Sequence, residues 1–274
     1  MGTSPYVPLD PRGWRLTMGL RPLELAAWLE VDDSYDGQLA LKTRLLEENH
    51  DAVVKTNPEG DDASRELLEE ICANLRTHHQ GIARGFEERE HPIVAASRLV
   101  QEDLCVMVRD DREWRLRAAC VCFPSRWDLA EKIGTTLDEI HRPVPGYDEV
   151  LAHPTNAFFD RLKPDRAFWR LNWTLLDSPA LFQPSSARHA PVGALEEWYF
   201  RVERQTLRAL PRTLAIVFTI RTYVTSAARL RDSDDTFSST LVHALESAPA
   251  SVASYKGWTG VAERLRDAWS YDER

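Results

Sequence analysis

One histidine of this chain is placed as a metal ligand would need to be. His141 follows Leu137 by four residues and Ile133 by eight, so on a helix it shares their apolar stripe. Pro143 ends the helix behind it, because proline donates no backbone hydrogen bond and disfavours helical geometry in the residue before it. An imidazole fixed in direction among apolar side chains can ligate a metal through one nitrogen. The alternative from spacing alone is a histidine that only closes the helix end.

The helix that carries this histidine is predicted to span residues 128–141. Asp128 can cap its first turn, and Glu131, three residues on, can complete a capping box. The sequence therefore predicts one continuous helix with the histidine in its last turn.

Two predicted strands carry charged side chains that could line a site. In residues 198–206, period-two alternation places Glu203 on one face of the strand. In residues 214–223, it places Arg221 and Tyr223 together, opposite an apolar face. An arginine in so apolar a run needs a partner, since an unpaired buried charge is costly. A structural pair of Arg221 with Glu203 is one interpretation, and a polar wall over a ligand is the other.

Other residues with ligating chemistry are weaker candidates. Arg170 and Asn172 share one face of a strand predicted over residues 168–175 and could extend that wall. The remaining histidines end helices, stand alone or lie in proline-containing loops: His50, His78, His79, His91, His153, His189 and His243. The four cysteines form no C-x-x-C pair, and we interpret them as reduced, buried thiols: Cys72, Cys105, Cys120 and Cys122.

The elements that must position these residues follow in a simple order. Helices are predicted first, then a hairpin, the helix with the histidine, three strands and further helices. Their ranges are 23–31, 39–49 and 65–77; 104–108 with 116–123; 128–141; 168–175, 198–206 and 213–224; and 239–247 with 260–269. This order predicts an α+β fold with an antiparallel sheet of about five strands. No glycine-rich phosphate loop occurs, which argues against a nucleotide cofactor bound in that way.

Composition narrows the class of partner. The 274 residues are 43% apolar, which is enough for a large core, and the net charge is −9. A general nucleic-acid binder needs a dense cationic face, and attachment to an anionic membrane needs one too. The sequence has no apolar signal core and no run of about 20 apolar residues. We therefore expect a cytoplasmic protein that binds neither nucleic acid nor membrane.

Several segments resemble successive motifs of the haem-dependent oxidative N-demethylase family, with order and spacing kept over residues 20–260. They are LVQEDLCVM (99–107), CFPSRWDLAEKIG (122–134), IHRPVPGY (140–147), RLNW (170–173), RVERQTLRALP (201–211), FTIRTY (218–223) and YKG (255–257). The resemblance implies a PAS-like domain that holds haem b and oxidises N-methyl groups with O₂. It also implies a proximal histidine on the helix beside the sheet, and His141 is the residue that fits this role.

The resemblance also assigns roles to the charged candidates. Arg142 and Arg170, with His141, are expected to bind the cofactor. Arg221, Glu203 and Tyr223 are expected to be catalytic, where they could orient an amine, bind a propionate or deliver protons.

The expected domain organisation is an extended, Pro- and Gly-rich arm over residues 1–20, followed by a single domain over residues 21–274. The expected reaction converts a secondary or tertiary N-methylamine, O₂ and two electrons into the demethylated amine and formaldehyde. Because the sequence shows no nucleotide fingerprint and no cysteine cluster for an iron–sulfur centre, a separate flavin reductase and ferredoxin-type donor are expected.

Three rival functions stay open from the sequence. A PAS-like haem protein could sense gas or redox state, although no output domain or coiled-coil helix follows here. The chain could instead be a haem-free subunit of the same assembly. A relative could also oxidise a different nitrogen compound in secondary metabolism, since a fold does not fix a substrate.

Overall fold

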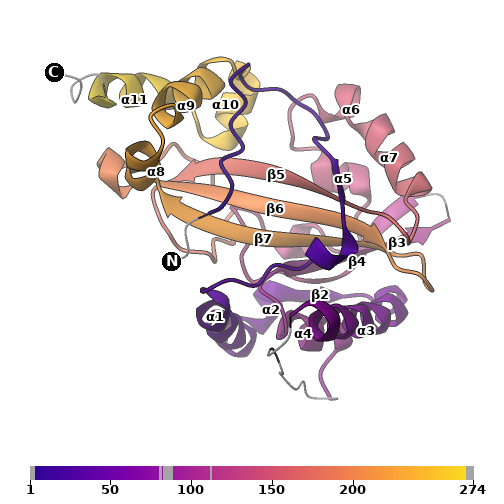
Figure 1. Cartoon of the computed structure of the whole chain (residues 1–274). Coiled ribbons are helices and arrows are strands. Elements are labelled where there is room, and N and C mark those ends of the chain that lie inside the picture. The colour runs from indigo at the N-terminus through magenta and orange to yellow at the C-terminus, as the bar shows by residue number, and fades with distance from the viewer. Residues whose placement is uncertain (1–3, 80–81, 83–88, 112, 270–274) are drawn as a thin grey trace.

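A computed structural model describes residues 4–79, 82, 89–111 and 113–269 (Figure 1). The first three residues of the predicted arm and the last five of the predicted domain lie outside the described residues. Among the described helices, none is both long and apolar enough to cross a bilayer.

A single antiparallel sheet forms the centre of the described structure, with strand order β1-β5-β6-β7-β3-β4-β2. Five strands are long: β3 (Asp103–Asp110), β4 (Glu113–Cys120), β5 (Ala167–Leu176), β6 (Tyr199–Ala209) and β7 (Ile216–Ser226). They confirm the predicted hairpin and the three strands after it. The sheet nevertheless has seven strands, because β1 (Arg21–Leu23) and β2 (Val54–Thr56) form its edges. Three residues are too few to show a period-two pattern, so these strands escaped prediction. The predicted helix over residues 23–31 is wrong, because β1 ends at Leu23 and only a 3-10 turn follows, at Leu25–Ala27.

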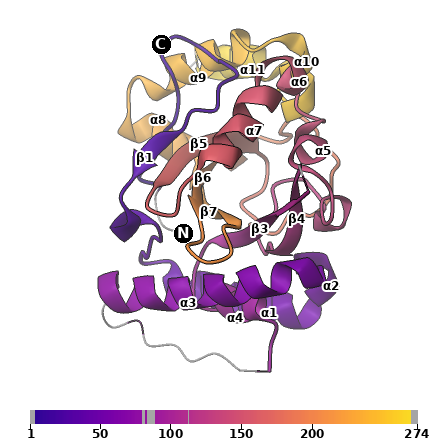
Figure 2. The same ribbon diagram turned by 90° about the vertical axis from the view of Figure 1, so that its right-hand side faces the viewer.

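Helices surround this sheet in three groups (Figures 1 and 2). The N-terminal group lies below it: α1 (Tyr35–Glu48), α2 (His50–Val53), α3 (Asp61–His78) and α4 (Pro92–Ser97). The crossover from β4 to β5 contains α5 (Leu137–His141), α6 (Tyr147–Val150) and α7 (Ala152–Arg161). After β7 come α8 (Ala227–Ser233), α9 (Phe237–Glu246), α10 (Ala250–Lys256) and α11 (Val261–Trp269). The prediction of a mixed fold with helices at both ends is confirmed.

The predicted single helix over residues 128–141 is wrong. The chain forms a 3-10 turn at Leu129–Glu131, capped by Asp128, and begins α5 only after Thr136. Gly134 separates the two, with a φ of 79° that suits glycine and interrupts a right-handed helix. The capping box is formed by Thr136 and Glu139. The side chain of each residue accepts a hydrogen bond from the backbone N–H of the other.

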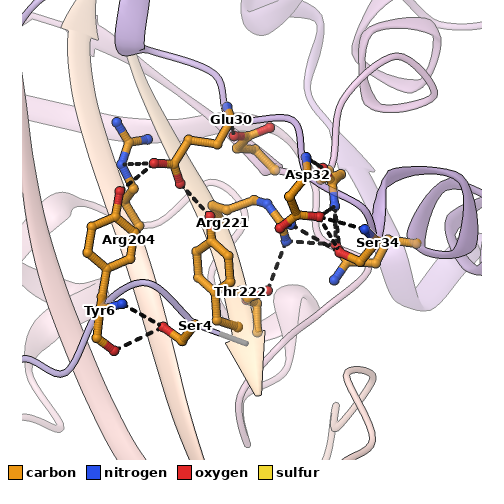
Figure 3. A network of polar contacts seen from close by, with 12 residues as sticks. Ser4, Tyr6, Glu30, Asp32, Ser34, Arg204, Arg221 and Thr222 are labelled. Carbon is orange, nitrogen blue, oxygen red and sulfur yellow. Dashed lines mark hydrogen bonds and ion pairs between the residues drawn. The ribbon is translucent and has the colours of Figure 1, made fainter. Parts of the chain in front are cut away.

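The lower face of β6 and β7 holds buried charge. Arg204 of β6 stands opposite Arg221 of β7, so neither can neutralise the other. Arg221 is fully buried and instead donates to Asp32 Oδ2 at 2.6 Å and to Gln38 Oε1 at 2.7 Å (Figure 3). Register pairs Glu203 with Thr222, which excludes the predicted pair of Arg221 with Glu203. A partner 189 residues away could not be identified from alternation within one strand.

A second carboxylate fastens the N-terminal arm to the same face. Glu30 accepts hydrogen bonds from the hydroxyls of Tyr6 and Tyr223, the latter at 2.5 Å, and lies 3.2 Å from Arg204 Nε (Figure 3). Burial, with the Glu30 hydrogen bond, raises the pKa of Tyr6 to about 12. Tyr6 therefore stays a hydrogen-bond donor at neutral pH, and residues before β1 become part of the folded structure.

The buried pair of Arg221 and Asp32 predicts an asymmetric response to substitution. Asp32→Asn should lower the free energy of unfolding by about 3–5 kcal/mol, because it leaves the guanidinium buried without a counter-charge. Arg221→Met should cost less, because the Asp32 side chain is 33% exposed and water can solvate it. Urea unfolding of both variants measures this. The double variant should resemble Arg221→Met, and equal losses in the two single variants would contradict the account.

Candidate functional site

A cavity of about 610 Å³ lies between the upper face of the sheet and the crossover segment. Its volume suits a cofactor or drug-sized ligand. Apolar side chains from β3, β4, β7 and the crossover form much of its wall: Cys105, Met107, Leu116, Leu137, Ile140, Val144, Phe218 and Ile220. The arm also contributes, from Trp14 to Leu20. Most of the surface is therefore dry, and any polar group on it acts with little competition from water.

His141 borders this cavity with one ring nitrogen already engaged. Its Nδ1 lies 2.8 Å from the Leu137 carbonyl oxygen, which can only accept, so Nδ1 carries the proton. The ring stacks on Tyr147 with centroids 4.9 Å apart. Burial lowers the pKa of His141, and the charges of Arg170 and Lys132 lower it further. The imidazole is therefore neutral and oriented, with the Nε2 lone pair at the opposite side of the ring.

The crossover holds this ring in place through short-range bonds. Asp138 accepts from the Tyr147 hydroxyl at 3.1 Å and from Asn156 Nδ2 at 2.7 Å, which joins α5 to α6 and α7. The Lys132 ammonium donates to the Ile140 carbonyl at 3.2 Å. A ligand histidine needs such support to keep its tautomer and ring direction.

The described residues contain no group of three or more His, Cys, Asp or Glu side chains that could hold a metal ion. A metal ion bound directly by the protein would need several such ligands. In haem the porphyrin supplies most of the iron ligands, so that one protein side chain can complete the site. A cavity with a single oriented histidine and apolar walls fits haem by this chemistry.

Polar side chains of β5, β6 and α10 form one connected wall. Glu203 Oε2 accepts from Asn172 Nδ2 at 3.2 Å and from Gln205 Nε2 at 2.9 Å. The Lys256 ammonium donates to Asn172 Oδ1 at 2.9 Å and to the Trp173 carbonyl at 3.0 Å. The lysine thus fixes the amide of Asn172 so that its NH₂ points to the carboxylate. Burial lowers the pKa of Lys256 to about 8.

Arg170 lies in the same wall without a matched partner. Its Nε is buried and donates to no acceptor within the described part of the chain. Burial lowers the pKa of this guanidinium, and the carboxylate of Glu203 raises it. An arginine in this condition is stabilised by an anionic group entering the cavity.

The structure separates the six residues that the sequence brought together as a site. His141, Arg170 and Glu203 border the cavity. Arg221 and Tyr223 lie on the opposite face of the sheet, with Asp32 and Glu30, so they are not in contact with this cavity. The Arg142 side chain is 68% exposed, lies 3.9 Å from Glu139 and is outside the lining.

The assignment of faces explains what sequence reasoning missed. The apolar side of β7, with Phe218 and Ile220, is the side that faces the cavity. Gln205 of β6 and Lys256 of the YKG motif also border it, and neither was a candidate. Gln205 shares the strand parity of Glu203, which was a usable signal. Lys256 reaches the sheet from a helix 84 residues after Asn172, and no spacing rule predicts that contact.

The lowered pKa of Lys256 predicts a pH-dependent stability difference. An unfolded lysine titrates near about 10.4, so between about pH 8 and 10.4 the unfolded chain binds more protons than the folded one. The penalty for burying the charged lysine is full below pH 8 and disappears as pH rises towards 10.4. Urea unfolding should therefore show wild type gaining stability relative to Lys256→Met across this window. Exposed Lys163→Met is the matched control, and the same pH trend in both variants would reject the burial of this charge.

A family model described as haem-dependent oxidative N-demethylase, alpha subunit-like, matches residues 19–80 and 76–266 of this chain. The match covers the edge strand β1, the whole crossover with His141 and the three strands that follow. It also covers Lys256, at the end of α10.

Proposed function

We propose a function from one premise: the chain belongs to the haem-dependent oxidative N-demethylase, alpha subunit-like family, whose name implies a haem-dependent oxidative enzyme. On that premise, the chain binds haem b in the cavity beside the sheet. It then uses O₂ to demethylate a small secondary or tertiary N-methylamine, with release of formaldehyde. The observation that carries this proposal is the neutral, oriented imidazole of His141 at the wall of an apolar cavity.

His141 is the residue that would hold the haem iron. The hydrogen bond to the Leu137 carbonyl raises the basicity of the ring and leaves Nε2 as its donor atom. Arg170 is the second proposed cofactor-binding residue, because it lines the same cavity and its buried Nε has no hydrogen-bond partner among the described residues. The antiparallel sheet with the histidine on a short helix beside it supports the PAS-like assignment.

When bound, haem supplies the activation of O₂ and the oxidation of the N-methyl group. The remaining tasks belong to the chain. Glu203, held by Asn172 and Gln205, is proposed to accept the N–H of a protonated amine and so to orient it. The apolar wall around Phe218 and Ile220 excludes water from the reacting group.

Electrons are proposed to arrive from separate flavin reductase and ferredoxin-type partners. This proposal rests on the sequence, which has no nucleotide fingerprint and no C-x-x-C pair. A cytoplasmic location accords with the four free cysteines.

The first prediction of this proposal concerns the iron. Full-length protein with His141→Ala should purify with little haem or with a clearly altered Soret band, because the axial nitrogen is gone. The exposed His153→Ala variant on α7 is the matched control and should keep the wild-type spectrum. Imidazole added to His141→Gly should restore the band. Full haem occupancy with an unchanged spectrum in His141→Ala would remove this residue as the ligand.

The second prediction concerns the source of electrons. The haem-loaded chain with NADPH alone should release no formaldehyde from dimethylamine, since its sequence has no nucleotide-binding fingerprint to hold NADPH. Addition of a surrogate flavin reductase and a ferredoxin should start turnover. Formaldehyde formed from NADPH and the chain alone would contradict the need for partners.

A further inference from the structure

The cavity is unusually cationic for an acidic protein. Its lining includes six basic side chains and two carboxylates, whereas the whole chain has a net charge of −9. The basic side chains are Arg15, Arg126, Lys132, Arg170, Arg188 and Lys256, and the carboxylates are Glu131 and Glu203. Cations gathered around an apolar space are stabilised when the occupant carries negative charge.

Several of these cations are already matched by protein groups. Arg15 lies 2.8 Å from Asp10, and Arg126 lies 3.3 Å from Asp177. Lys256 is bonded within the polar wall, as described above. Lys132 and Arg188 differ, because neither has a carboxylate oxygen within 4.0 Å among the residues that the structure describes. These two side chains are therefore free to bind an anion.

Lys132 lies on the crossover side of the cavity, next to the turn that carries the histidine. One N–H of its ammonium bonds to the Ile140 carbonyl at 3.2 Å, which leaves the others available. Burial lowers the pKa of Lys132; Glu131 raises it, and the positive charge of Arg188 lowers it again. Both side chains line the same cavity, so an anion held there is attracted by both charges.

Arg188 also lines the cavity and is exposed. Its guanidinium sits 3.9 Å from the ring centroid of Tyr255 and donates from Nη1 to the Tyr255 carbonyl at 3.1 Å. Stacking fixes the plane of the fork, and the remaining N–H groups can bind a carboxylate in two-pronged fashion.

We propose that Lys132 and Arg188 form a carboxylate-binding site at the rim of the cavity, and that its ligands are the two propionate groups of haem. This inference rests on the proposed haem function. It sets the orientation of the cofactor, with the iron at His141 and the carboxylate edge between these two side chains. It also replaces Arg142, which is exposed and directed elsewhere, in the set of cofactor-binding residues.

The test compares ferric haem with haem dimethyl ester, which has the same ring and iron but no propionate charge. Each is titrated into the full chain, purified after expression without added haem, and the Soret band gives the affinity. Wild type should bind haem more tightly than the ester. Arg188→Met should weaken haem binding about tenfold, as expected for a lost charge-assisted hydrogen bond, and leave the ester unaffected. Lys132→Met should lower the ratio of haem affinity to ester affinity by about the same factor, and it should also weaken both ligands alike to some degree, because its ammonium bonds to the Ile140 carbonyl beside His141.

Matched controls separate this role from general charge and from folding. Arg142→Met and Lys163→Met remove exposed cations outside the lining and should keep the wild-type ratio of haem to ester affinity. Lys132→Arg and Arg188→Lys should recover most of the loss, because the charge remains. The ester is an internal control, since a misfolded variant would bind neither ligand.

The outcomes divide cleanly. The site is supported if the ratio of haem affinity to ester affinity falls only in the Lys132 and Arg188 variants. It is overturned if haem and ester binding weaken equally, or if the ratio is unchanged. A further titration with sarcosine and dimethylammonium tests whether the carboxylate belongs to a substrate. Loss of sarcosine binding in the two variants, with an unchanged haem-to-ester ratio, would overturn the propionate assignment. If wild type binds neither haem nor its dimethyl ester, the proposed function itself is contradicted.

Discussion

Neighbouring side chains of a strand point to opposite sides of a sheet, and in the central strands of this protein both sides are buried. Glu203 and Arg204 are adjacent in the sequence, yet one borders the cavity and the other is tied to the N-terminal segment. Each face must therefore satisfy its own charges. The lower face does so with Asp32 and Glu30, which leaves the upper face to hold a ligand.

The two faces of the sheet therefore differ in what their polar groups bond to. The lower face is closed, because its arginines meet carboxylates and carbonyl oxygens of this same chain. The upper face borders a cavity, and among the residues that the structure describes His141 keeps the lone pair of its Nε2 at the wall of that cavity.

Sequence reasoning succeeded where a local pattern determines the structure. The spacing of Leu137 and His141 predicted an inward histidine, and this placement survived although the helix is much shorter than expected. Alternation found all five long strands and the shared face of Arg170 and Asn172. It could not say which face of β7 meets the cavity. Alternation shows that Arg221 and Tyr223 share a face, but not on which side of the sheet that face lies. The partner Asp32 and the neighbour Lys256 come from distant segments, where periodicity carries no information.

The two ends of the chain meet at this cavity. Residues from Trp14 to Leu20 form one part of its wall and Lys256 another, while Ser4 bonds to Thr225 at 3.1 Å. A ribosome makes the first segment long before the strands and helix that it will touch. Because the lining runs from Trp14 to Lys256, it is complete only once both segments have been synthesised and have folded together.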